Sequence, residues 1–409
     1  MRISTASQFD RSVDLIQRRQ LALQASHEQL ASGKRITRAS DDPTQAASAE
    51  RALARESRLE SHQRALESSR QVMAQSESAL GSAVNIMQRI RELVVQAGNA
   101  AGGDANRKVI AEELRGLRQQ LLGVANQQDG NGNFLFAGQG GATAPFVEGA
   151  GGVEFRGTAG SLASALGSAV PMSVDGSETW MQAATGNGVF KAAYARDPSA
   201  PASHQTQAWI DVGRVTDPAS LTGESYSLTF TGDASAGYSV TITRTTGAGS
   251  PVAESPRPYV SGQPIAFDGM EVTISGVLSA GQDTFDITPS TRDLSVFGVL
   301  DGLSGDLGTS GRSGAQVAQT VQDGLRDLDS VMGSLMTMRS RMGWMMEQAD
   351  GLDGRLGDGR MSAQAQRSAA EDVDMAKAIT DFQGHQTSYD AALKAYSMVQ
   401  RLSLFEYIR

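Results

Sequence analysis

The chain contains no cysteine, so neither disulfide bonds nor thiolate chemistry is available to it. Aromatic residues make up only 5% of its 409 residues, which is little for a protein built around one large globular core. No apolar run approaches the roughly 18 residues of a membrane-spanning helix, and the N-terminus lacks the apolar segment of a signal peptide. The formal net charge of −9 argues against nucleic-acid binding. We therefore expect no membrane or nucleic-acid partner, and either a cytoplasmic protein or export without a cleaved signal.

Proline is nearly confined to the middle of the chain. Ten of the eleven prolines lie between Pro145 and Pro289, and Pro43 stands alone in the first arm. Most of the 45 glycines also lie in this middle part, which is acidic. Two arms poor in helix breakers thus flank a region rich in turn-forming residues.

The N-terminal arm has apolar residues at heptad spacing. Two columns repeat every seven residues, and a third segment alternates steps of four and three: Phe9, Ile16, Leu23, Leu30; Leu59, Leu66, Met73, Leu80, Met87, Val94; and Ile110, Leu114, Leu117, Leu121, Val124. This is the seam pattern of coiled coils. Between the first two columns, Gly33 can end one helix, and Asp42 can cap the next with Pro43 at its first position.

The C-terminal arm repeats the pattern. Its seam comprises Val321, Leu325, Leu328, Met332, Leu335 and Met342. We expect a glycine-rich interruption at 351–359, and a new start at a capping box formed by Ser368 and Glu371. The last helix then carries Met375, Ile379, Phe382, Tyr389, Leu393 and Tyr396, with Gln386 as a polar exception.

The middle of the chain has the alternation of β-strands. Segments 226–231 and 238–243 alternate apolar and polar residues around the turn-forming stretch 232–237, which predicts a hairpin. Segments 270–274 and 284–288 are expected to form another strand pair.

These patterns predict a mainly α protein with an inserted β domain, in which both chain ends form a long antiparallel coiled-coil bundle. A helix over 44–98 would be roughly 80 Å long, so its narrow apolar stripe must pair with other helices. We assign 1–43 and 360–409 to terminal assembly helices, 44–140 and 300–359 to a helical bundle domain, and 141–299 to an exposed β-rich domain.

Nothing in the sequence indicates catalysis. His27, His62, His204 and His385 have no second ligand at metal-binding spacing, and no phosphate-binding loop or nucleophile elbow is present. The carboxylates at 41–42 and 371–374 lie where acids stabilise helix N-termini. We expect no enzyme activity, no cofactor, no metal and no catalytic residue.

The heptad arms instead predict a structural protein that polymerises. We expect the terminal segments 1–32 and 366–409 to be weakly supported within one subunit and to become ordered on assembly. The expected assembly residues are Phe9, Ile16, Leu23, Leu30, Ile379, Phe382, Tyr389, Leu393 and Tyr396. The expected bundle core comprises Leu59, Leu66, Met73, Leu80, Met87, Leu114, Leu117, Leu121, Leu325, Leu328 and Leu335.

Both ends also resemble the bacterial flagellin superfamily. The segments that carry this resemblance are Leu30–Ile36 (Leu-Ala-Ser-Gly-Lys-Arg-Ile), Ala39–Pro43 (Ala-Ser-Asp-Asp-Pro) and Ala370–Ala376 (Ala-Glu-Asp-Val-Asp-Met-Ala). Three further segments are similar to the members that join hook and filament: 131–138 with the following Pro145-Phe146, the stretch 264–285, and 402–408. Together these matches cover roughly two thirds of the chain.

The resemblance implies a secreted component of the bacterial flagellum that is needed for motility. Such a protein would leave the cell through the flagellar type III export apparatus, aided by a cytoplasmic chaperone. It would assemble as a ring of copies between the first hook-associated protein and the flagellin filament. Two alternatives remain open from the sequence: a minor or divergent flagellin, and a coiled-coil adhesin or secreted translocation protein.

Overall fold

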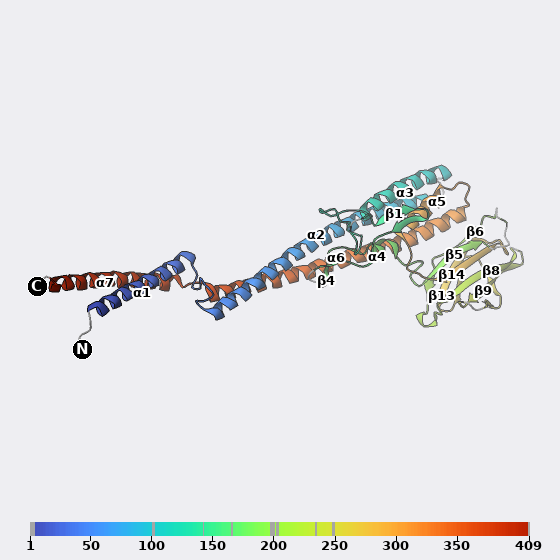
Figure 1. The fold of residues 1–409 in the computed structure, drawn as a ribbon. Coiled ribbons are helices and arrows are strands. Elements are labelled where there is room, and N and C mark those ends of the chain that lie inside the picture. Colours follow the sequence, from blue (N-terminus) through green and yellow to red (C-terminus); the bar gives the residue numbers. More distant parts are fainter. Residues whose placement is uncertain are drawn as a thin grey trace. The chain divides into compact units, whose positions relative to one another are not determined.

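The computed structural model describes residues 5–407 apart from 100–102, 142, 165–166, 197–200, 202–203, 234 and 248–249. Side chains at 5–9, 163–169, 196 and 399–407 lie outside this description. The chain forms two compact units (Figure 1). The terminal unit comprises Met1–Arg64 and Gly351–Arg409, and the central unit comprises Ala65–Asp350. Two long helices contribute to both units, and each unit is described separately below.

The helices are α1 (Thr5–Ser32), α2 (Pro43–Ala97), α3 (Gly103–Ala125), α4 (Gly176–Met181), α5 (Val296–Gly308), α6 (Gly314–Glu371) and α7 (Met375–Tyr407), with a 3-10 turn at Pro218–Ser220. The strands are β1 (Phe146–Gly149), β2 (Gly152–Phe155), β3 (Ala163–Ser164), β4 (Gly167–Pro171), β5 (Phe190–Arg196), β6 (Gln207–Ile210), β7 (Arg214–Val215), β8 (Ser225–Asp233), β9 (Gly237–Thr245), β10 (Val252–Ala253), β11 (Arg257–Tyr259), β12 (Pro264–Phe267), β13 (Met270–Val277) and β14 (Asp283–Pro289). Long helices at both ends and strands in the middle confirm the predicted fold class.

In the central unit, α2 and α6 run antiparallel and are joined by ion pairs of Arg339 with Glu77 (2.6 Å) and of Arg91 with Asp329 (3.0 Å). Arg89 links α2 to Glu113 of α3 at 2.9 Å. The seam between the helices is fully buried in its middle: Met73, Leu80, Met87, Leu114, Leu121 and Leu335 each have 0% exposure. Phe136, Phe146, Trp180 and Phe297 form an aromatic cluster in this unit, with ring distances of 5.6–6.2 Å.

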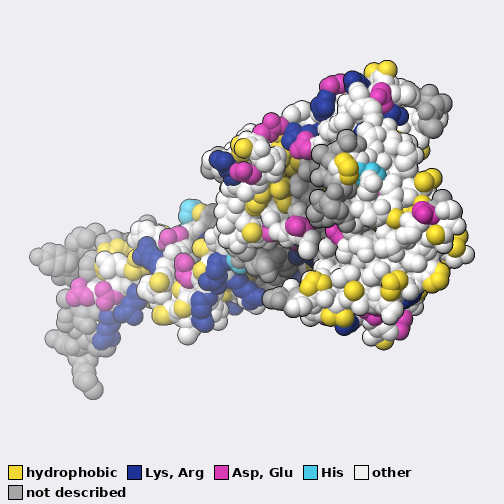
Figure 2. Space-filling view, turned by 90° about the vertical axis from the view of Figure 1, so that its right-hand side faces the viewer, with side chains coloured by type: hydrophobic (Ala, Val, Ile, Leu, Met, Phe, Trp, Pro, Cys, Tyr) yellow, Lys and Arg dark blue, Asp and Glu magenta, His cyan; other side chains and the backbone are white. Residues whose placement is uncertain are grey.

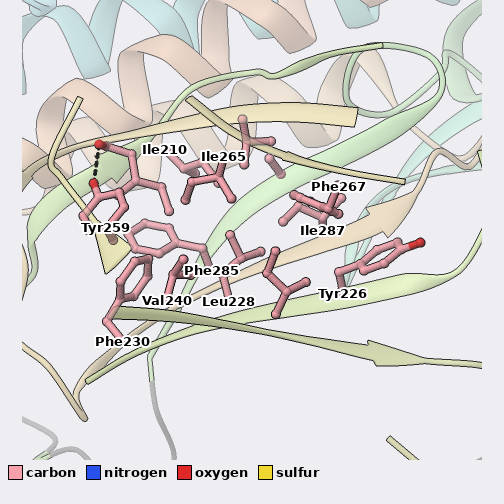
Figure 3. Packing of buried hydrophobic residues seen from close by; sticks show 14 of the residues in the cluster. Ile210, Tyr226, Leu228, Phe230, Val240, Tyr259, Ile265, Phe267, Phe285 and Ile287 are labelled. Atoms are coloured by element: carbon pink, nitrogen blue, oxygen red, sulfur yellow. Dashed lines mark hydrogen bonds between the residues drawn. The ribbon is translucent and has the colours of Figure 1, made fainter. Parts of the chain in front are cut away.

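The inserted region is an antiparallel β-sandwich. One sheet has the order β10-β9-β8-β14-β5, with β11 also pairing with β9, and the other has the order β12-β13-β6, with β7 pairing with β13. Alternate side chains of β8 point into the core, where Tyr226, Leu228 and Phe230 are almost fully buried. Figure 3 shows this core, in which Phe230 packs against Tyr259 and Phe285 at ring distances of 5.0 and 6.0 Å.

A polar contact surface on α6 fastens the sandwich to the helices within the central unit. Gln319 accepts a hydrogen bond from the backbone N–H of Ile210 in β6 at 2.9 Å. Further along α6, Arg326 donates to the carbonyl of Ala192 in β5, and Ser330 donates to the carbonyl of Ala184. The joint therefore relies on directed hydrogen bonds at buried or half-buried positions.

Several local predictions are confirmed. Helix α1 ends at Ser32 and Gly33 adopts a positive φ of 68°, while α2 begins at Pro43 and Asp42 accepts a hydrogen bond from the N–H of Gln45 at 3.1 Å. The hairpin predicted over 226–243 is the β8–β9 pair.

Three local predictions were wrong. No interruption occurs at 351–359, because α6 continues unbroken from Gly314 to Glu371. The expected capping box at Ser368 therefore lies inside α6, and α7 is capped by Asp374, which accepts hydrogen bonds from the N–H groups of Ala376 and Lys377. Strands β13 and β14 both exist but do not pair with each other, since β14 lies between β8 and β5.

Candidate assembly surface

The two connectors at the base of the terminal helices are bound to each other. The N–H of Arg35 donates to the carbonyl of Glu371 at 2.7 Å, and the N–H of Val373 donates to the carbonyl of Gly33 at 3.0 Å. Lys34 adds an ion pair with Glu371 at 3.2 Å. One short antiparallel bridge between distant parts of the sequence thus joins the end of α1 to the start of α7.

The acidic residues of the first connector serve its backbone. Asp41 accepts hydrogen bonds from the N–H groups of Arg38 (2.9 Å) and Thr37 (3.2 Å), and the bond from Arg38 is the main cause of its lowered pKa. The pKa of Asp42 is lowered chiefly by the hydroxyl of Thr44, which donates to it at 2.7 Å. Both carboxylates are therefore ionised, with Asp42 capping α2 and Asp41 holding the backbone of the connector, a state that suits neither a general acid nor a shared proton.

Helices α1 and α7 pack side by side as a two-helix arm (Figure 1). Ser26 and Ala378 are buried at 8% and 6% exposure, and the rings of His27 and Phe382 lie 6.3 Å apart. The heptad residues along this contact are only half-buried: Ile16, Leu23 and Leu30 on α1, and Phe382, Tyr389 and Tyr396 on α7. One two-helix contact covers part of each apolar stripe and leaves the rest exposed.

The remaining predicted assembly residues of α7 face outward. Ile379 is 46% exposed and Leu393 is 40% exposed. Met375, 48% exposed and four residues before Ile379, lies on the same helical face. We call Met375, Ile379 and Leu393 the outward strip of α7. The predicted residue Phe9 has a side chain outside the described part of the chain.

Other exposed apolar residues of the arm were missed by the sequence reasoning. Leu15, Leu21 and Met398 are 48%, 64% and 64% exposed. None of them falls on the heptad columns used for prediction. A search for apolar residues displaced from the seam would have found them, although only a structure shows how far they stay exposed.

The residues predicted for the bundle core divide between the units. In the central unit, Leu66, Met73, Leu80, Met87, Leu114, Leu121, Leu328 and Leu335 are buried to 1% exposure or less, while Leu117 and Leu325 are half-buried. Leu59 belongs to the terminal unit, where it is half-buried and packs against Gly359.

The described residues contain no group of three or more His, Asp or Glu side chains suited to a metal ion. None of the helices, over the same residues, is long and apolar enough to cross a membrane. The buried pair of His204 and Asp283 (2.8 Å) joins the segment before β6 to β14, and Asp283 also accepts from the N–H of Ser279. This arrangement ties loops of the sandwich together and includes no nucleophile.

Comparison with known proteins identifies the class. Residues 3–140 match the family model of the bacterial flagellin N-terminal helical region, and residues 325–408 match that of the bacterial flagellin C-terminal helical region. The two matches together cover more than half of the chain, so this chain belongs to the bacterial flagellin family. The relatives are structural flagellar proteins, in agreement with the prediction of a structural protein rather than an enzyme.

Within that family, the similarity over the full length is to one particular member. The chain is 24% identical over 410 residues to flagellar hook-associated protein 3 of Escherichia coli, covering 99% of both chains. It is 35% identical over 154 residues to the same-named protein of Salmonella typhimurium, which covers 37% of this chain and 48% of that protein. The crystal structure of hook-associated protein 3 from Legionella pneumophila superposes with a TM-score of 0.69 at 26% identity, covering 77% of this chain and 97% of that one. The crystal structure of FlgL from Xanthomonas campestris superposes with a TM-score of 0.66 at 27% identity, covering 78% of this chain and 99% of that one.

Proposed function

We propose that this chain is an adaptor at the junction between flagellar hook and filament, where copies assemble through their terminal helices. The similarity to hook-associated protein 3 over 99% of the chain supports the place of action. The observation that carries the mechanism is the outward strip of α7, because three large apolar side chains stay 40–48% exposed on one helical face. Several large apolar side chains exposed on one helical face indicate an interface that the subunit itself does not fill.

The proposal assigns a role to each part of the chain. The terminal arm packs against other copies in a ring, with the first hook-associated protein on one side and flagellin on the other. The helices of the central unit form the rigid body of the subunit, and the β-sandwich is exposed outside. The connected expectations are secretion by the flagellar export route and a chaperone that covers the arm before export.

Replacing Leu393 with Asp tests the outward strip. Because Leu393 is 40% exposed in the subunit, the new charge remains hydrated there, and we expect the folded subunit to survive. In an assembled ring the same carboxylate would lose its water without gaining a partner, at a cost of several kcal/mol. The expected result is a strain with intact hooks that sheds flagellin into the medium and does not swim.

Ala391→Asp is the matched control. It adds the same charge two residues away at an exposed position that lies neither on the strip nor toward α1. This variant should swim normally, and the helical circular dichroism of both purified variants should match the wild type. Normal motility of the Leu393→Asp strain would show that the strip is not the assembly surface.

A minor flagellin is the second candidate, because the flagellin of Bacillus subtilis is 34% identical over 119 residues. That match covers only 29% of this chain, so it leaves the inserted region unexplained. Deletion distinguishes the two: loss of an adaptor sheds complete filaments, whereas loss of a minor flagellin leaves filaments attached with altered composition.

A further inference from the structure

Helix α2 carries an arginine face within the terminal unit. Arg51, Arg55 and Arg58 follow one another at steps of four and three, which places them on one side of the helix, and all three are exposed. None of them forms an ion pair with any residue that the structure describes; Arg51 donates only to the carbonyl of Ala47 in its own helix, at 3.0 Å. Like charges at this spacing repel each other, so the face gains from an acidic partner. On the face that Figure 2 shows, more Lys and Arg side chains lie on the helical parts than on the sandwich.

The same stretch of α2 presents a different face on its other side. Glu50, Leu53 and Glu60 are exposed there, Leu53 by 44%. At 100° per residue, this acidic face and the arginine face lie on opposite flanks of the buried line formed by Ala49 and Ala52. Within the described residues, neither Glu50 nor Glu60 has an ion pair. Arg64, one turn beyond Glu60, donates to Ser61 instead.

The acidic residue on the buried side of α2 already has an ion-pair partner within the subunit. Glu56 pairs with Arg367 of α6 at 2.8 Å. The subunit therefore neutralises the acid that faces its own second helix and leaves both flanks available. This distribution of charges suits a helix that contacts a neighbouring copy on each of its two exposed flanks.

The two faces carry opposite charges, and these charges lie at similar positions along the helix axis. In a flat ring, copies related by rotation about a common axis place the same residues at the same level. Arg51 of one copy would then meet Glu50 of the next, and Arg58 would meet Glu60, each one or two residues apart along the helix. The aliphatic stem of Arg55 would lie over Leu53. A contact between two different faces is heterologous, and such contacts generate rings or helical arrays.

We propose that the arginine face of α2 docks on the Glu50–Leu53–Glu60 face of α2 in a second copy of this chain, side by side and parallel. The proposal rests on the proposed function, since it describes how neighbouring copies in the ring recognise one another. Exposed ion pairs contribute little affinity. Their role here is to set which flank meets which and at what height, while the outward strip of α7 supplies apolar burial.

Cysteine cross-linking tests the contact, and the absence of cysteine from the chain makes introduced thiols unique. Two variants, Arg58→Cys and Glu60→Cys, are expressed together in flagellated cells that lack the chromosomal copy, and separately in parallel cells. Isolated flagella are treated with a short bis-maleimide and probed for cross-linked dimers. We expect a several-fold higher dimer yield from the mixture than from either variant alone, because only unlike flanks meet.

The outcomes separate the two proposals. If the chain is present in isolated flagella and the mixture gives no more dimer than the single variants, the docking of α2 is refuted and the junction role stands. If the chain is absent from flagella while hooks and filaments are normal, the junction role fails and the docking proposal falls with it.

Charge exchange provides a second measurement. Arg51→Glu with Arg58→Glu should lower the fraction of cells with filaments several-fold, by placing acid against acid. Adding Glu50→Arg and Glu60→Arg to the same chain should restore it, because the faces are then complementary again with reversed sign. Failure of the four-fold variant to recover, while its isolated fold matches the wild type, would contradict pairing of these faces.

Discussion

The joint between the sandwich and α6 depends on one buried cation, and its removal should destabilise the central unit. The side chain of Arg326 is 6% exposed and forms ion pairs with Asp323 (2.7 Å) and Asp327 (2.9 Å). Replacing it with Met keeps an unbranched apolar stem but leaves Asp323 with Gln319 as its remaining donor, at 2.8 Å. Breaking a fully buried pair costs about 3–5 kcal/mol. Asp323 is still 29% exposed, so we expect a loss of about 2–3 kcal/mol near neutral pH.

The loss should depend on pH. Burial already raises the pKa of Asp323 above its ordinary value of 3.8, against the opposing effects of Arg326 and Gln319. Without Arg326 this pKa rises further. A carboxyl group whose pKa is higher in the folded than in the unfolded state destabilises the fold fully above its folded pKa. The penalty then declines as the pH falls through the folded pKa toward the unfolded value. Arg326→Met should therefore lose less stability at about pH 5 than at about pH 7.5.

Urea unfolding of the wild type, Arg326→Met and Arg326→Met with Asp323→Asn measures these effects. The double variant removes the charge of Asp323 and leaves Asp327 as the one former partner of Arg326 that is still charged. It should therefore recover part of the lost stability at neutral pH and lose most of the pH dependence of the single variant. An equal deficit at both pH values, with no rescue by Asp323→Asn, would refute the reasoning. It would show that Arg326 acts through packing rather than by neutralising Asp323.

Two further predictions concern the helices. Gly354→Ala should raise the free energy of unfolding by about 0.5–1 kcal/mol, because nothing lies within 4 Å of the added methyl group. Gly324→Ala in the same helix should lower it by about 1–3 kcal/mol, because its methyl group would overlap Leu303. Opposite signs in thermal melts are the expected result, and equal signs would contradict it. In the dilute subunit, the backbone amide hydrogens of α1 and α7 should exchange with solvent much faster than those of α2 beyond residue 65. The reason is that Ser26 and Ala378 are the only buried side chains among the described residues of the arm. Hydrogen-exchange mass spectrometry checks this, and slow exchange throughout α1 and α7 would show that the arm is stable without a partner.

The features predicted correctly from sequence are those encoded locally. The Asp42-Pro43 start of α2 and the Gly33 end of α1 follow from capping chemistry within a few residues. The β8–β9 hairpin follows from strict alternation around a turn, where Gly232 adopts a φ of 99° that favours glycine. In each case neighbouring residues determine the backbone, so no distant contact is needed.

The incorrect predictions fail where distant contacts outweigh local preference. Gly351, Gly354, Gly357 and Gly359 each weaken a helix, yet α6 continues because Leu356 and Ala363 are buried at 7% and 0% exposure. Gly359 even serves the packing, since a methyl group there would come within 3.3 Å of Leu59. Likewise β14 inserts between β8 and β5, a pairing across long stretches of chain that no local pattern specifies.

The heptad pattern also could not distinguish a completed seam from an incomplete one. Met73, Met87 and Phe382 fall on equally regular columns, but the first two have 0% exposure and Phe382 is only half-buried. The difference lies in the number of surrounding helices. Arg89 and Arg91 of α2 reach both α3 and α6 in the central unit, whereas in the described part of the arm α1 and α7 pack mainly against each other.

An incomplete seam has a consequence for assembly. If the arm were fully buried within the subunit, as the α2 seam is, nothing would remain to drive association; if it had no intramolecular contact, the exposed stripe would favour indiscriminate aggregation. Pairing α1 with α7 shields one side of each stripe and leaves the outward strip of α7 exposed, together with Leu15, Leu21 and Met398. Further copies would complete that burial, and the opposite charges on the flanks of α2 would restrict which orientation of the neighbour can do so. On this reasoning the apolar strip supplies the free energy of assembly, the charged faces select the geometry, and the loss of either should produce a different defect: no incorporation for Leu393→Asp, and misdirected or infrequent incorporation for the arginine-face variant.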